Sequence, residues 1–213
     1  MRDNYTEMRN RMRTQFLQYD QAEMIRRFSL RHDAEYIHIR FVARDYRIGR
    51  ANGVVEWSED GFVTCTEADY SESMSIYDVL CCSKPDCCLS GEFMPDGSLK
   101  GTVFTGATKL EALKLVDCAG MFDAHPDELK IACERLGGMT EGRGDVAFRI
   151  PVFVFLPIRF AFWHGDEDFP PEIRILWDGN VLDYMHYETL WFIKGHLLRR
   201  LMEEIRNQLP TEG

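Results

Sequence analysis

Two pairs of adjacent cysteines are the side chains best suited to chemistry in this sequence. Cys81-Cys82 and Cys87-Cys88 flank a short segment that contains Pro85, so a turn would bring the two pairs together. Thiolate sulfur is a soft ligand that suits Zn²⁺ and iron–sulfur clusters. Neither pair has the Cys-x-x-Cys spacing of a zinc knuckle. Neighbouring side chains of a helix point about 100° apart, so the four sulfurs converge only if the helix ends at Cys81. The alternative interpretation is a set of partly buried free thiols.

An acidic and aromatic segment before two prolines is the second candidate site. It consists of Trp163, His164, Gly165, Asp166, Glu167, Asp168 and Phe169. Side chains alternate along an extended chain, so His164, Asp166 and Asp168 would share one face and suit a divalent cation or acid–base catalysis. Trp163 and Phe169 would wall a small-molecule pocket beside the carboxylates. The alternative is a solvated hairpin connection whose carboxylates keep a sheet edge soluble.

No established catalytic motif accompanies these candidates. The sequence has no Gly-x-Ser-x-Gly, no His-Glu-x-x-His and no dinucleotide-binding fingerprint. Asp178 and Asp183 would approach the acidic segment from the far end of its hairpin. His186 and Glu188 are one further pair of side chains that could take part in a site. The sequence therefore specifies no reaction and leaves the cofactor unknown.

Charge and composition exclude several classes of protein. The net charge is −10, although residues 1–50 hold eleven Arg and only seven Asp or Glu, so the Arg-rich first helix is a candidate contact surface. An acidic chain without a basic face argues against nucleic-acid binding. No apolar run reaches the roughly 18 residues of a membrane span, and no secretory signal is visible. A cytoplasmic protein is therefore expected, and in that compartment the seven cysteines argue against a disulfide framework; their odd number leaves at least one thiol unpaired. A small molecule or another protein is the expected partner, and the oligomeric state stays undefined.

Hydrophobic periodicity predicts a single α+β domain over residues 1–213, with a mostly antiparallel sheet packed against N-terminal, middle and C-terminal helices. The predicted helices cover Tyr5–Phe28, Ser75–Cys82, Thr108–Phe122 with Thr108 as its cap, a segment from Pro126, and Tyr184–Leu209. Short strands are predicted between Glu35 and Cys65, at Thr102–Phe104, and between Val146 and Trp177.

The C-terminal part of the chain resembles a known family. Its motifs are Leu136-Gly137-Gly138, Gly144-Asp145-Val146-Ala147-Phe148, Pro157-Ile158, the acidic segment from Trp163 to Pro170, and Ile175-Leu176-Trp177-Asp178 before a closing helix. This order resembles domain of unknown function 3786, a family of anaerobic bacteria and archaea in which some members carry an iron–sulfur module. The resemblance implies a shared fold and makes the acidic segment a family hallmark, but it implies no activity. The present chain lacks a ferredoxin-type cysteine run.

Three functional hypotheses follow. The first is an accessory or ligand-binding domain whose site lies at residues 163–169. The second is a zinc or iron–sulfur protein that uses the four clustered cysteines. The third is a metal-assisted hydrolase that uses His164, Asp166 and Asp168.

Overall fold

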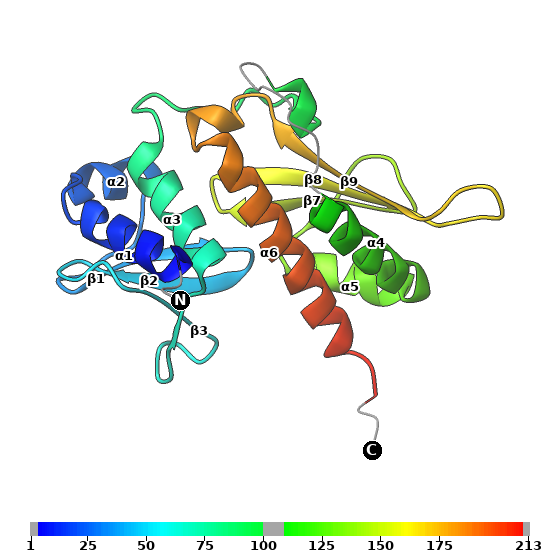
Figure 1. Ribbon diagram of the computed structural model, residues 1–213, viewed down its shortest axis with the longest axis horizontal. Coiled ribbons are helices and arrows are strands. Elements are labelled where there is room, and N and C mark those ends of the chain that lie inside the picture. Colours follow the sequence, from blue (N-terminus) through cyan, green and yellow to red (C-terminus); the bar gives the residue numbers. More distant parts are fainter. Residues whose placement is uncertain (1–3, 100–108, 211–213) are drawn as a thin grey trace. The chain divides into compact units, whose positions relative to one another are not determined.

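The computed structural model describes residues 4–99 and 109–210, which form two compact units (Figure 1). Unit 1 comprises Met1–Cys88, Phe153–Phe155 and Asn180–His196, and unit 2 comprises Leu89–Val152, Leu156–Gly179 and Leu197–Gly213. The predicted strand at Thr102–Phe104 and the predicted cap at Thr108 lie outside the described residues.

Unit 1 begins with two helices where the sequence predicted one. They are α1 (Asn4–Phe16) and α2 (Gln21–Phe28). The predicted continuous helix Tyr5–Phe28 is wrong because Asp20 takes an extended backbone conformation and its carboxylate accepts hydrogen bonds from the backbone N–H groups of Ala22 and Glu23. Asp is a strong N-cap residue, so a new helix starts there.

The third helix of unit 1 carries the residues that matter most below. Helix α3 (Tyr70–Cys82) starts with a capping box, in which the Asp69 side chain and the Glu72 side chain each accept a hydrogen bond from the other's backbone N–H. It ends at Cys82, since Ser83 has extended backbone angles. The predicted helix Ser75–Cys82 is confirmed at its C-terminal end, but it starts earlier, at Tyr70. Because it does not end at Cys81, the condition for convergence of all four clustered sulfurs is not met.

The sheet of unit 1 is an antiparallel meander. Its strands are β1 (Tyr36–Phe41), β2 (Arg44–Gly49), β3 (Val55–Ser58) and β4 (Thr66–Glu67), in the spatial order β4-β3-β2-β1. At its outer edge β1 pairs Phe41 with Phe153. Helices α1, α2 and α3 lie on one side of this sheet (Figure 1). Residues 187–196 of the long helix α6 (Tyr187–Arg206) also belong to unit 1.

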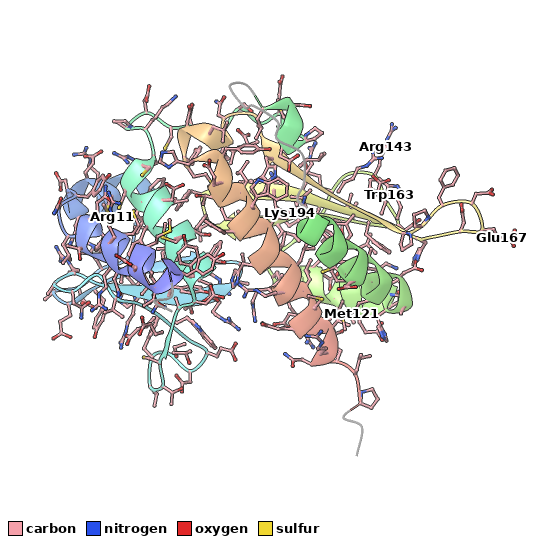
Figure 2. All side chains as sticks on the ribbon, viewed as in Figure 1. Arg11, Met121, Arg143, Trp163, Glu167 and Lys194 are labelled. Atoms are coloured by element: carbon pink, nitrogen blue, oxygen red, sulfur yellow. The ribbon has the colours of Figure 1, made fainter. Side chains whose placement is uncertain are left out.

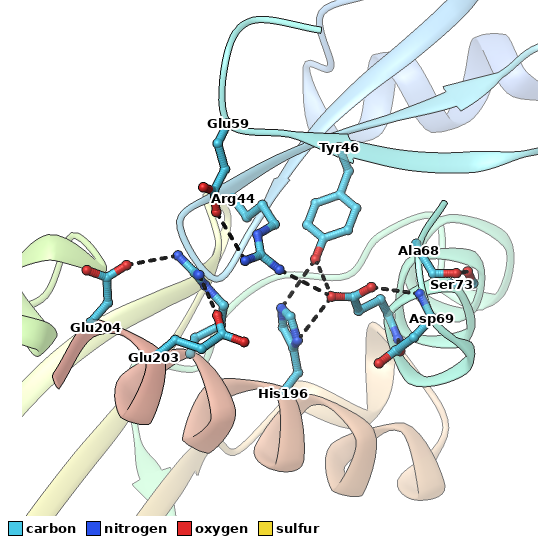
Figure 3. A network of polar contacts seen from close by, with 11 residues as sticks. Arg44, Tyr46, Glu59, Ala68, Asp69, Ser73, His196, Glu203 and Glu204 are labelled. Atoms are coloured by element: carbon cyan, nitrogen blue, oxygen red, sulfur yellow. Dashed lines mark hydrogen bonds and ion pairs between the residues drawn. The ribbon is translucent and has the colours of Figure 1, made fainter. Parts of the chain in front are cut away.

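A polar network is buried in unit 1 (Figure 3). The Tyr46 hydroxyl donates to Glu72 Oε1 at 3.0 Å and lies 3.3 Å from His196 Nε2. His196 Nδ1 is 3.5 Å from the same Glu72 oxygen, and Arg44 Nη1 is 3.6 Å from it. Burial, ahead of the charge of Glu72, raises the pKa of Tyr46, and burial likewise raises the pKa of Glu72. The network gives the Glu72 carboxylate polar partners from β2 and α6 and so joins three elements of the core.

Unit 2 combines antiparallel strands with helices. Its helices are α4 (Lys109–Ala124), α5 (Pro126–Arg135) and residues 197–206 of α6. Its strands are β5 (Phe93–Met94), β6 (Met139–Thr140), β7 (Val146–Phe153), β8 (Leu156–Trp163) and β9 (Glu172–Asp178). The last residue of β7, Phe153, belongs to unit 1. The strand order is β7-β8-β9-β5, with β6 paired to β7. The Phe122 ring of α4 packs edge-on against Phe160 and Phe162 of β8.

These two units confirm the predicted α+β class with antiparallel sheets. In the described part of the chain, no helix combines the length and the apolar character that crossing a membrane requires.

Candidate metal site

Helix α3 places a carboxylate and a thiol on one face. Asp78 and Cys82 are four residues apart, so their side chains lie one above the other on the helix surface. Asp78 is buried and Cys82 is half-buried. The helix ends at Cys82, because Ser83 has extended backbone angles.

A histidine from a distant part of the chain meets this face. His186 immediately precedes α6, and its Nδ1 atom lies 2.6 Å from Asp78 Oδ1. The other carboxylate oxygen, Oδ2, accepts hydrogen bonds from the His186 backbone N–H at 2.8 Å and from the Thr189 hydroxyl at 2.5 Å. The start of α6 is thereby fixed to α3, and Asp78 is held in one orientation.

Asp78, Cys82 and His186 offer one oxygen, one sulfur and one nitrogen that all lie within 4.8 Å of one another. Among the residues that the structure describes, they form the one group of three or more His, Cys, Asp or Glu side chains with this property. These are the three donor types of zinc sites, with ligand bonds of about 2.0–2.3 Å. Tetrahedral coordination would place the nitrogen and oxygen roughly 3.3 Å apart, so the hydrogen-bonded pair at 2.6 Å has to separate by under an ångström.

The Cys82 thiol is held in its protonated form. Burial, followed by the charge of Asp78 and a hydrogen bond to it, raises the pKa of Cys82 to about 11. The thiolate is the nucleophile in cysteine catalysis, and catalytic cysteines have lowered pKa values. The environment of Cys82 therefore argues against a Cys-His-Asp nucleophile, whereas a metal ion deprotonates its thiol ligand directly.

Solvent reaches the group from the histidine side. The His186 side chain is 67% exposed, while the Asp78 side chain is 9% exposed. An ion would have a route of entry past the imidazole and would keep a coordination position that faces water. Three protein ligands with one open position is the arrangement of catalytic or exchangeable zinc sites rather than closed structural ones.

Comparison with known proteins places the chain in a family. The sequence model described as Domain of unknown function (DUF3786) matches residues 20–200. The chain belongs to the DUF3786 family. This confirms the predicted family, and the matched range includes Asp78, Cys82 and His186. Neither the curated proteins nor the solved structures gave a significant match.

The four clustered cysteines of this DUF3786 protein have different surroundings. Cys81 is buried, Cys82 and Cys87 are half-buried, and Cys88 is exposed. Among the described residues, no three of their sulfurs lie within 4.8 Å of one another. Burial raises the pKa of Cys81 to about 12, and it also raises the pKa of Cys87. The structure brings only Cys82 of the four into the candidate site.

The acidic segment forms an exposed loop of unit 2 between β8 and β9 (Figure 2). Glu167 lies at its outer end and Trp163 at its base, where the Arg174 guanidinium stacks on the indole at 5.0 Å. Asp166 accepts hydrogen bonds from the backbone N–H groups of Asp168 and Phe169, so its carboxylate shapes the turn. Phe169 is 71% exposed.

His164 pairs with a residue that sequence reasoning did not associate with it. Its Nδ1 is 2.9 Å from Asp123 Oδ1 on α4, and its backbone N–H donates to Asp145. Hydrogen bonds from the His164 side chain and the Gly165 backbone lower the pKa of Asp123. His164 therefore anchors the base of the loop, away from Asp166 and Asp168.

The remaining predicted carboxylates have other partners. Asp178 lies six residues along β9 from Glu172, which pairs with Trp163, so it is roughly 20 Å from the loop. It is buried and accepts hydrogen bonds from the Ser90 and Gly91 backbone N–H groups. Asp183 pairs with Lys84 at 2.5 Å. The expected approach of Asp178 along the hairpin is thus wrong.

Asp78 is the candidate ligand that the sequence analysis missed. The signal was present, because Asp78 and Cys82 have a four-residue spacing within a predicted helix, and such a pair is typical of helical metal ligands. His186 was noted only with Glu188, its neighbour in sequence, while its partner in the fold lies 108 residues away.

Proposed function

We propose that this protein is an accessory metal-binding domain that holds one divalent transition-metal ion, zinc by preference, through Asp78, Cys82 and His186. The observation that carries the proposal is the convergence of three different ligand atoms within 4.8 Å. The hydrogen bonds from Thr189 and from the His186 backbone to Asp78 support it, since metal ligands are commonly oriented by such outer contacts.

The donor set favours zinc over the hard cations. Mg²⁺ and Ca²⁺ require six or more oxygen ligands, and the group offers one carboxylate. A thiolate and an imidazole suit zinc, cobalt and copper instead. A reducing compartment such as the cytoplasm would keep Cys82 available, and all seven cysteines are unpaired.

The charge of the ligands favours binding over hydrolysis. One thiolate and one carboxylate neutralise the two positive charges of the ion. A catalytic zinc site with three neutral histidine ligands leaves both charges in place. A neutralised zinc ion acidifies its bound water less, so it is a weaker source of hydroxide. We therefore assign the site to holding or delivering an ion, with one position open to an external ligand.

Titration with Co²⁺ tests the proposal, since this ion reports a thiolate ligand through charge-transfer absorption. We expect saturation at one ion per chain with a sulfur-to-cobalt band, and loss of the band in Cys82→Ser. Cys87→Ser removes a half-buried thiol that is not one of the three proposed ligands, so this variant should keep the sulfur-to-cobalt band. A wild-type protein without the band, or a band abolished only by Cys87→Ser, would refute the assignment.

A further inference from the structure

A second feature of unit 1, independent of the proposed metal site, is a hollow at the outer edge of strand β1. It has a volume of about 150 Å³ and lies between the end of α2, the strand and the Val154-Phe155 turn. On one side of it the His38 backbone N–H donates to the Arg31 carbonyl, and on the other Phe41 pairs with Phe153. Along this edge, β1 is therefore bonded to the Arg31 segment before the hollow and to Phe153 after it.

The walls of the hollow are aromatic. The rings of Phe28 and Phe155 stack at 4.0 Å between centroids with an interplanar angle of 18°. Val154 at the rim is 74% exposed, although two-residue hairpin turns normally carry polar residues or glycine. A volume of about 150 Å³ matches that of an apolar cavity that accepts benzene. The hollow therefore has room for one aromatic ring.

The rim is cationic. Arg31, His38 and Arg40 line the hollow. Asp33, which does not line it, accepts two backbone N–H bonds and lies 3.3 Å from His38 Nε2, while His38 Nδ1 lies 3.4 Å from the Arg31 guanidinium. This chain of contacts connects the Arg31 guanidinium to Asp33 through His38.

The second arginine of the rim is free to turn toward a ligand. Arg40 pairs with Asp45 at 3.3 Å, but both side chains are more than half exposed, so the pair is weak. Two guanidinium groups beside an aromatic wall match a planar carboxylate, which arginine binds through paired hydrogen bonds.

We propose that this hollow binds a small aromatic carboxylate, with the ring against Phe28 and Phe155 and the carboxylate at Arg31 and Arg40. The two guanidinium groups favour an anion, the stacked rings favour an aromatic group, and the hollow has room for one ring. This site uses none of the residues of the metal group, so either site can exist without the other.

Sodium benzoate is the probe, with benzyl alcohol as the uncharged analogue and inorganic phosphate as the anion without a ring. We expect benzoate to shift the NMR signals of the Phe28 and Phe155 rings with a dissociation constant on the order of 1 mM. Arg31→Gln should weaken binding about tenfold, because a charge-assisted hydrogen bond is lost. Val154→Asp should also weaken it by placing a negative charge at the exposed rim.

Arg26→Gln is the matched control, since Arg26 lies on α2 with a 77% exposed side chain and does not line the hollow. It should leave benzoate binding unchanged. The proposal is overturned if benzoate shifts neither ring, if benzyl alcohol or phosphate binds equally well, or if Arg26→Gln weakens binding as much as Arg31→Gln.

Discussion

Asp78 Oδ1 and His186 Nδ1 lie 2.6 Å apart, although 108 residues separate them in the chain. This contact joins helix α3 to the residue before α6, and the Cys82 sulfur lies within 4.8 Å of a carboxylate oxygen of Asp78 and of a ring nitrogen of His186. The carboxylate is oriented by Thr189 and by the His186 backbone, so two of the three ligand atoms are held in place. Such preorganisation is what a metal site needs from its protein.

Metal affinity should rise with pH. The pKa of Cys82 is raised to about 11, so at neutral pH the thiol carries a proton that an incoming ion must displace. The release of one proton makes the apparent association constant increase about tenfold per pH unit until pH approaches that pKa. Competition with a chromophoric chelator between pH 7 and 9 measures this slope. A Cys82→Asp variant has no thiol proton to release and should show a flatter slope; equal slopes for the two proteins would contradict the assignment of Cys82 as a ligand.

Removal of the Thr189 hydroxyl should weaken zinc binding without abolishing it. Thr189→Val keeps the shape of the side chain and removes the 2.5 Å hydrogen bond to Asp78. Loss of such an outer contact typically costs about 10- to 100-fold in metal affinity. Isothermal titration calorimetry with Zn²⁺ provides the measurement. An affinity equal to that of the wild type would show that Asp78 does not depend on this contact for its orientation.

The acidic loop should be dispensable for metal binding. A variant that combines His164→Ala, Asp166→Ala and Asp168→Ala removes the ligands of the hydrolase hypothesis while α3 and His186 remain intact. We expect it to bind one zinc ion with wild-type affinity. Loss of the ion in this variant, measured by elemental analysis after gel filtration, would show that the ion binds at the acidic loop.

Asp178 should be important for stability. It is 1% exposed and accepts hydrogen bonds from the Ser90 backbone, the Ser90 hydroxyl and the Gly91 backbone. Asp178→Ala should lower the free energy of unfolding by about 3 kcal/mol, because buried donors lose a charged acceptor. Asp166→Ala is the matched control, since Asp166 also accepts two backbone N–H bonds but lies in an exposed loop, and its cost should stay below about 1 kcal/mol. Urea denaturation distinguishes the two, and equal losses would contradict the structural role of Asp178.

Glu72 should make stability depend on pH in an unusual direction. Burial raises its pKa above the ordinary 4.5, so the folded state holds this proton more tightly than the unfolded state. Its contribution to the free energy of unfolding is fully present below pH 4.5 and declines as pH rises through the folded value. Glu72→Gln cannot ionise, so its stability relative to wild type should increase between pH 4 and 7. A constant difference over that range would show that Glu72 has an ordinary pKa.

The sequence predicted the elements of the fold better than their ends. The period-two and helical patterns identified the α+β class because apolar residues must face a core in each element. The first helix was predicted as continuous because Met and Phe keep a helical spacing across Asp20. The capping preference of Asp20 was the competing signal, and its hydrogen bonds to Ala22 and Glu23 decide the outcome.

The candidate site was predictable only in part. Cys82 was named from composition, but its neighbours in the fold depend on how α3 meets the start of α6, and sequence distance carries no information about that contact. The acidic loop drew attention because three adjacent acids are unusual. The β8–β9 register, which pairs Trp163 with Glu172, leaves those acids beyond the paired strands and in solvent.

The zinc content of the purified protein after equilibration with Zn²⁺ and removal of unbound ion tests the central claim most directly. We predict one zinc ion per chain for the wild type and for the Cys87→Ser control, and none for Cys82→Ser or His186→Ala, with circular dichroism confirming that all four proteins are folded. A wild-type protein without zinc, or variants at Cys82 and His186 that retain it, would contradict the assignment of these residues as metal ligands.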